Sequence, residues 1–118
     1  MVEIIKSHQG DILCLDCAGV NSVETHFRII ELIVSETANI VGKKKVFVDV
    51  RKLAGEIDML GKFTVGERVS ERLAGIFIAT LAARARITGI GENAAVNRGA
   101  TMIVTWNKET ALKWLTDS

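Results

Sequence analysis

The stretch at residues 45–51, Lys-Val-Phe-Val-Asp-Val-Arg, is the feature that most limits what this chain can fold into. Its nearly continuous β-branched and aromatic residues predict a strand that is buried on both faces, and such strands are typical of parallel sheets. A charged loop follows, and a helix is expected to begin at Asp58. In open α/β sheets, ligands and partners usually bind in the crevice beyond the carboxyl ends of the strands. The loop after this strand is therefore the first place to look for function.

The rest of the chain alternates between strand and helix patterns. Extended apolar runs predict further strands at residues 2–6, 11–18, 75–81 and 101–106. Apolar residues at helical spacing predict helices at residues 23–41, 58–73 and 92–98, and from residue 108 towards the C-terminus. The order β-β-α-β-α-β-α-β-α implies an α/β fold, with a mostly parallel five-stranded sheet, an antiparallel N-terminal strand and flanking helices. We expect one domain over residues 1–118, since domains commonly hold roughly 100–150 residues.

Capping residues mark the expected helix boundaries. Asn21 stands three residues before Glu24 in a capping pattern, Asp58 and Asn107 precede two other helices, and Gly42 is placed to end the first helix. The first helix should turn one apolar face inward, formed by Val23, Phe27, Ile30, Val34, Ala38 and Val41. The second helix should present on one side Met59, Phe63, Gly66, either Val69 or Ser70, and Leu73. A glycine in this row would allow the second helix to lie close to the sheet.

Charge and composition exclude several classes of function. Fifteen Lys and Arg against fourteen Asp and Glu leave a net charge of +1, so no basic surplus predicts a nucleic-acid partner. The longest uncharged run, residues 73–83, is shorter than the ~18 residues of a membrane span, so no transmembrane segment is expected. No secretory signal is visible at the N-terminus, and together with only two cysteines this favours the cytoplasm. The hydrophobic content of 48% suggests that some apolar surface faces a partner subunit, an apolar ligand or a membrane surface.

Two short motifs imitate cofactor sites. Cys14 and Cys17 form a CxxC pattern, but residues three apart on a strand point to opposite faces, which suits neither a disulfide nor shared metal ligation. His8 and His26 lie on a predicted turn and helix at spacings unsuited to zinc. Residues 89–94 resemble a dinucleotide-binding glycine motif, yet a segment separates them from the preceding strand. We expect no metal or other cofactor, and no enzyme, because two histidines allow no nucleophile–base–orienter arrangement.

The order of elements and one short motif carry a resemblance to a known family. A hairpin, a long amphipathic helix, the Val-Phe-Val-Asp-Val strand and the Asp-x-x-Gly at residues 58–61 resemble the STAS fold of anti-sigma-factor antagonists and sulfate-transporter tails. The second half, above all residues 92–100 and 105–115, is similar to the bacterial SpoIIAA-like group of that superfamily. The resemblance implies a non-enzymatic regulatory module that binds another protein.

The resemblance also draws attention to the start of the second helix. Anti-sigma-factor antagonists carry a phosphorylatable serine after the aspartate of an Asp-Ser-x-Gly motif, where phosphate meets the helix N-terminus. Here the motif reads Asp58-Met59-Leu60-Gly61, so methionine stands at the acceptor position. Thr64 lies beyond the cap and would be a poor substitute. The expected module therefore lacks the usual phosphoacceptor.

Asp49 is the other polar residue that the sequence singles out, because a carboxylate within an apolar strand is unfavourable unless it is hydrogen-bonded or paired. One interpretation is a structural bond to loop amides, to Arg51 or to Lys52. The other is a carboxylate that recognises a partner together with Asp58.

Two functional hypotheses follow. The preferred one is a STAS-like binding module that contacts an unknown protein or its own copy through Asp49, Asp58, Met59, Leu60, Phe63 and Thr64. The alternative is a carrier or sensor of a small apolar molecule or lipid, since some relatives of this architecture resemble lipid-transfer modules. In that case Ile57, Met59, Leu60 and Phe63 would form the lip of a cavity between sheet and helices. The competing interpretation is that these four residues are ordinary core and helix-edge residues.

Overall fold

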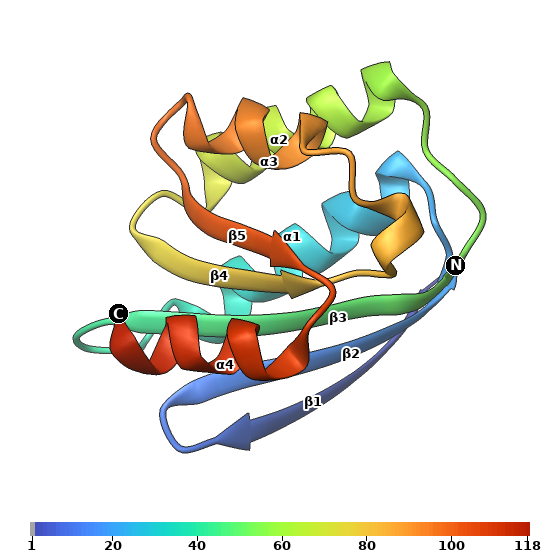
Figure 1. Cartoon of the computed structure of the whole chain (residues 1–118). Coiled ribbons are helices and arrows are strands. Elements are labelled where there is room, and N and C mark those ends of the chain that lie inside the picture. The colour runs from blue at the N-terminus through green and yellow to red at the C-terminus, as the bar shows by residue number, and fades with distance from the viewer. Residues whose placement is uncertain (1) are drawn as a thin grey trace.

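The computed structural model describes residues 2–118, and its five strands form one sheet in the order β1-β2-β3-β4-β5 (Figure 1). The strands are β1 (Val2–Gln9), β2 (Ile12–Val20), β3 (Lys44–Ala54), β4 (Ile76–Leu81) and β5 (Thr101–Thr105). The helices are α1 (Val23–Thr37), α2 (Met59–Arg72), α3 (Ile90–Val96) and α4 (Lys108–Asp117), with the short 3-10 helix η1 (Arg84–Arg86).

The sheet has the topology expected from the sequence. β1 pairs antiparallel with β2, and the pairs β2–β3, β3–β4 and β4–β5 are parallel. β3 is central, and Val46, Phe47 and Val48 are buried on its two faces. This burial explains the apolar run, because a central parallel strand is covered by helices on both sides. The α/β fold with its antiparallel N-terminal strand is confirmed.

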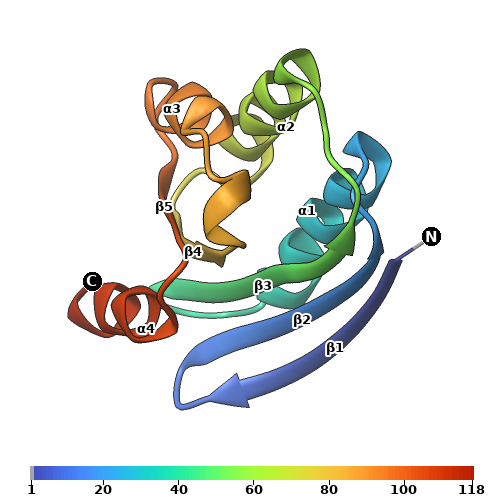
Figure 2. The same cartoon turned by 45° about the vertical axis from the view of Figure 1, so that its right-hand side comes forward.

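Helices cover the two faces unequally. α1, α2 and α3 lie on one face of the sheet, whereas α4 lies on the other (Figure 2). The larger core cluster joins side chains such as Leu15, Ile30 and Val48 to the three-helix side. The smaller cluster joins Phe47 and Leu81 to the α4 side. Alternation along each strand therefore assigns a residue to one of two separate cores.

The first helix begins at the predicted residue, Val23, but its capping residue and its C-terminal end differ from the prediction. Ser22, not Asn21, caps α1, and its side-chain oxygen accepts a hydrogen bond from the Thr25 amide. The helix ends at Thr37 rather than Val41, which is 99% exposed. The apolar spacing continues past Thr37, but residues 38–41 form an exposed turn before β3. The inward residues are Thr25, Ile29, Ile30, Ile33 and Thr37, so only part of the predicted face was right.

The second helix buries part of the predicted face. Gly66, Val69 and Leu73 are buried as predicted, whereas Met59 and Phe63 are exposed. Asp58 caps α2 as expected, and its carboxylate accepts a hydrogen bond from the Gly61 amide at 2.7 Å. Gly66 is buried, but it allows a close approach to α3 rather than to the sheet. A Cβ at Gly66 would lie 2.3 Å from the Gly91 carbonyl oxygen. α2 packs chiefly against α3 and α1, so α2 and α3 form a tightly joined pair above the sheet.

The last two helices begin close to where the sequence placed them. α3 starts at Ile90, two residues earlier than expected, and Gly99 has the left-handed φ of 100° that suits a chain reversal before β5. Asn107 caps α4 by accepting a hydrogen bond from the Thr110 amide. Ala111 and Leu115 are buried against the sheet as predicted.

Candidate functional site

A cavity of about 370 Å³ lies between the sheet and the three helices α1, α2 and α3. Aliphatic side chains from both helices and strands form most of its wall: Ile29, Ile30, Ile33, Val48, Val50, Val65, Val69, Leu73, Ile78 and Met102. The volume falls within the roughly 300–1,000 Å³ typical of small-molecule sites. The cavity is therefore large enough and apolar enough to hold a small hydrophobic ligand.

The polar residues of the cavity come from one end of the sheet. Asn21 follows β2, Glu56 follows β3, and Arg86 and Thr88 follow β4, so these residues lie beyond the carboxyl ends of parallel strands. Lys62 reaches the same end from α2. This is the crevice in which open α/β sheets usually bind their ligands. The cavity thus has an apolar interior and a polar end.

His26 lines this polar end in a fixed orientation. Its Nε2 lies 2.7 Å from Oδ1 of Asn21, whose Nδ2 donates to the Gly55 carbonyl at 3.1 Å. Because the Asn21 amide nitrogen is the donor to Gly55, Oδ1 is the acceptor and Nε2 of His26 carries the hydrogen. Burial lowers the pKa of the imidazole to about 4. His26 is therefore neutral near pH 7, and its Nδ1 is an acceptor.

Lys62 links α2 to the segment that follows β4. Its Nζ donates to the Arg86 carbonyl and to Oγ1 of Thr88, both at 3.3 Å. The Arg86 guanidinium donates in turn to the Leu53 carbonyl at the end of β3. These bonds hold two cationic side chains at the polar end of the cavity.

The residues predicted at the start of α2 lie mostly on the outside of the protein. Met59 is 70% exposed and Leu60 is 74% exposed. Phe63 is also exposed, with the Arg98 guanidinium 4.8 Å from its ring centroid. The Thr64 hydroxyl donates to the Leu60 carbonyl. Met59 and Leu60 are therefore not core residues; they lie at the exposed edge of the helix and form an apolar surface patch at its first turn.

Only one of the four residues expected to form a lip lines the cavity. Ile57 does so, whereas Met59, Leu60 and Phe63 are not part of its wall. The prediction failed because helical spacing was read with Met59 inward. Asp58 caps the helix through Gly61, and the buried row begins at Gly61 and continues through Gly66 and Val69.

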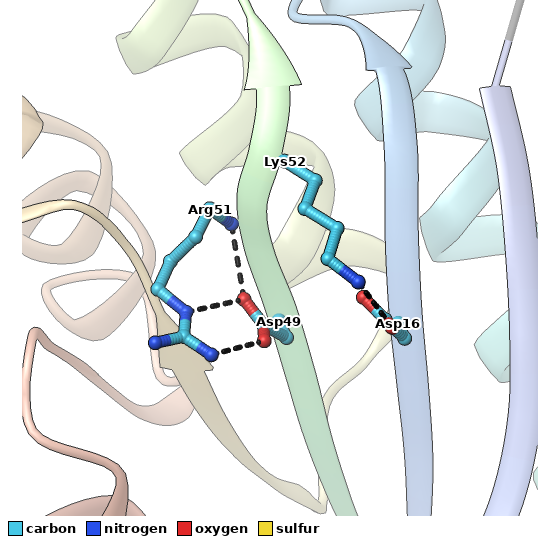
Figure 3. Close-up of polar contacts among 4 residues, drawn as sticks. All are labelled: Asp16, Asp49, Arg51 and Lys52. Atoms are coloured by element: carbon cyan, nitrogen blue, oxygen red, sulfur yellow. Dashed lines mark hydrogen bonds and ion pairs between the residues drawn. The ribbon is translucent and has the colours of Figure 1, made fainter.

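Asp49 lies apart from the α2 residues. It alternates on β3 with Val48 and Val50, which face α1–α3, so its side chain is on the opposite face of the sheet. Its carboxylate accepts bonds from the Arg51 amide and from Nε and Nη2 of the same arginine, at 2.9–3.0 Å (Figure 3). The structural interpretation involving Arg51 is thus confirmed, whereas Lys52 pairs instead with Asp16 at 3.0 Å.

The bonds from Arg51 control the ionisation of Asp49. Burial by itself would raise the pKa of this carboxyl, but the hydrogen bonds from Arg51 and the charges of Arg51 and Lys52 outweigh it and lower the pKa below its ordinary value. Asp49 is consequently a charged structural partner of Arg51. Its position on the other face separates it from Asp58.

The two cysteines occupy opposite faces of β2, as predicted. Cys14 packs with the α4-side core and Cys17 with the three-helix-side core, and both thiols are free. Burial, with smaller contributions from Asp16 and Asp49, raises the pKa of Cys17 to about 12. Within residues 2–118, no three His, Cys, Asp or Glu side chains are grouped closely enough to hold a metal ion.

Comparison with known proteins bears on the fold. No protein-family profile matches the chain, and no curated sequence matches it. A solved structure of an uncharacterized DUF3478-family protein from Shewanella loihica PV-4, described as having a SpoIIAA-like fold, superposes with a TM-score of 0.58 at 17% identity. The alignment covers 97% of this chain and 93% of the other. This chain has a SpoIIAA-like fold.

A second solved structure supports the same assignment. RsbS from Moorella thermoacetica, in a serine-to-glutamate variant, superposes with a TM-score of 0.57 at 15% identity, covering 97% of this chain and 95% of that one. The SpoIIAA-like architecture expected from the sequence is thus confirmed for the fold. Among residues 2–118, no helix of this SpoIIAA-like fold combines the length and apolarity that a membrane crossing requires.

Most residues of the cavity escaped sequence analysis. Ile33, Val48 and Ile78 read as ordinary core residues, because apolar periodicity does not distinguish a filled core from a hollow one. His26 was the one sequence feature that could have indicated the cavity, because it is a titratable residue on the helix that packs its apolar face against the sheet. Its position one helical turn before Ile30 places it at the end of the apolar row.

Proposed function

We propose that this protein is a non-enzymatic carrier or sensor of a small apolar ligand, which it holds between the sheet and helices α1–α3. The cavity of about 370 Å³ is the observation that supports the proposal. Its aliphatic wall offers van der Waals contact and no nucleophile. The SpoIIAA-like fold agrees with a regulatory rather than a catalytic module.

The shape and lining of the cavity favour an apolar occupant. The cavity is partly open to solvent, so water can reach its aliphatic wall when no ligand is bound. Removing apolar surface from water is favourable by roughly 25 cal/mol per Å². An apolar ligand would gain this free energy by covering the wall.

Native mass spectrometry of the gently purified protein tests the proposal. We expect an added mass in the native spectrum that disappears when the protein is denatured, and an organic extract that contains a molecule of the same mass. Thermal unfolding of delipidated protein with added apolar compounds gives an independent readout. Since a ligand at 100 times its Kd stabilises by about 2.7 kcal/mol, Tm should rise by about 11 °C for a chain of this length. No added mass and no Tm shift with any apolar compound would reject the proposal.

A second candidate function rests on a different observation, the apolar patch formed by Met59 and Leu60. We propose that this patch contacts another protein or a second copy of the chain. Two adjacent apolar side chains that are 70% and 74% exposed support a contact surface. Methionine at the acceptor position implies a contact that is not switched by phosphate there.

Sedimentation of the wild type and of the Leu60→Glu variant tests self-association through this patch. We expect the wild type to dimerise at high concentration and the variant to stay monomeric. A matched control is Val41→Glu, which alters a residue that is equally apolar but lies far along the chain and is 99% exposed. A monomeric wild type would exclude the second copy and leave a different protein as the partner to be sought.

A further inference from the structure

The polar end of the cavity indicates the chemical class of its ligand. Resting on the proposed function, we propose that the ligand is an amphipathic anion, with an apolar chain inside the cavity and a carboxylate bound by Lys62 and Arg86. The two cations line the same cavity as the aliphatic side chains. An occupant that satisfies both parts of the wall needs an apolar body and a negatively charged end.

Among the residues that the structure describes, Lys62 and Arg86 combine partial burial with the lack of a carboxylate partner. Within residues 2–118, several lysine and arginine side chains form ion pairs: Lys6, Lys45, Arg51, Lys52, Arg72 and Arg98. In the same part of the chain, neither Lys62 nor Arg86 forms one, although both are half-buried. Partial burial weakens the hydration of a cation, so an incoming anion would gain from pairing with it.

Both cations keep hydrogen-bond donors for a ligand. Lys62 uses its ammonium group on the Arg86 carbonyl and on Thr88, and a lysine has more N–H groups than these two acceptors occupy. Arg86 donates through Nη1 to Leu53, which leaves most of the guanidinium N–H groups free. The existing bonds hold the two side chains in place, so binding an anion would require little further ordering.

The acidic residues of the cavity do not take the place of such an anion. Oε2 of Glu92 accepts a hydrogen bond from the Val104 amide at 3.0 Å, which directs this carboxylate towards β5. Glu56 lies in the exposed loop before α2 and forms no ion pair with Lys62 or Arg86. His26 is neutral near pH 7 and contributes no charge of its own. The positive charges of Lys62 and Arg86 are therefore available to pair with an anionic ligand.

The cavity volume limits the size of the chain. A cavity of about 150 Å³ holds one benzene molecule, so a cavity of 370 Å³ holds about 15 heavy atoms at the same packing. A medium-chain carboxylate such as decanoate fits this limit. Long-chain lipids with two acyl tails do not.

A panel of three probes with the same chain tests the inference. Isothermal titration of delipidated protein at neutral pH would compare decanoate, decanol and decylamine. We expect decanoate to bind at least about tenfold more tightly than decanol, because a charge-assisted bond to a cation is stronger than a neutral one. Decylamine should bind most weakly.

Two lysine variants test whether Lys62 is responsible for the preference for decanoate over decanol. Lys62→Gln keeps a hydrogen-bonding side chain but removes the charge, and it should lower decanoate affinity by about tenfold more than it lowers decanol affinity. Lys113→Gln removes an exposed lysine of α4, outside the cavity, and should change neither affinity.

The possible results separate this inference from the function on which it rests. Equal binding of decanoate and decanol, or tighter binding of decylamine, would overturn the anionic class and leave an apolar carrier. Binding of none of the three probes would reject the carrier itself. The wild-type panel decides the class even where a variant fails to fold.

Discussion

Filling the cavity from the sheet should stabilise the protein. Val48 lies at the centre of β3 and lines the cavity, so Val48→Phe would place four additional heavy atoms in the space. By the benzene comparison, these atoms fill roughly 100 Å³. At about 24 cal/mol per Å³, the gain in the free energy of unfolding is at most about 2.4 kcal/mol. The unfolding entropy of a chain of this length is about 0.25 kcal/mol per K, so Tm should rise by up to about 10 °C.

A matched variant on the same strand should behave in the opposite way. Val46 lies two residues before Val48 and faces the same core, but it is fully buried and is not part of the cavity wall. Val46→Phe should therefore overpack the core and destabilise the protein by about 1–3 kcal/mol. Both variants would be compared with the wild type by urea unfolding and calorimetry on delipidated protein.

The same pair of variants also bears on ligand binding. Val48→Phe should bind apolar probes more weakly than the wild type, because the added ring occupies the space that they need. If Val48→Phe destabilises the protein as much as Val46→Phe does, the space beneath α2 is already filled by protein atoms. That result would refute both the cavity and the energy assigned to it.

Three further predictions follow from the packing and ionisation of single residues. Burial holds the pKa of His26 near 4 in the folded protein, so the unfolded chain binds a proton more readily. The free energy of unfolding should therefore fall as pH drops from about 6.5 to about 4. In urea titrations across this range, the free energy of unfolding of His26→Gln should depend less on pH. Gly66→Ala should destabilise the protein by about 1–3 kcal/mol, since its methyl group would meet the Gly91 carbonyl oxygen, and an unchanged Tm would contradict the close contact of α2 and α3. Cys17, with a pKa of about 12, should react with a disulfide reagent only after unfolding, which mass mapping of labelled peptides would reveal; rapid labelling in the folded state would show that the site opens.

Local signals in the sequence predicted much of the fold. The apolar run of β3 identified a central parallel strand, and the side chains of Asp58 and Asn107 marked the starts of α2 and α4. These predictions succeeded because burial on both faces and capping depend on residues that are close in the sequence.

The predictions that were wrong concern features that depend on contacts between segments distant in the sequence. The end of α1 at Thr37 and the exposure of Met59 are set by where the chain finds surface to bury, which spacing alone does not encode. The partner of Gly66 proved to be α3, and no local pattern distinguishes a neighbouring helix from a sheet. Apolar periodicity in the sequence does not reveal the cavity, for the same reason. Its wall uses the same aliphatic residues as a solid core.

The contact between Gly66 and Gly91 has a consequence for how a ligand reaches the interior. With backbone against backbone, α2 and α3 are expected to move away from the sheet as one unit. Four connections join this pair to the rest of the fold, at residues 55–58, 73–75, 87–89 and 97–100, and all four would have to flex. Substitutions on the outer side of α3, far from any bound molecule, would then change how fast that molecule enters and leaves.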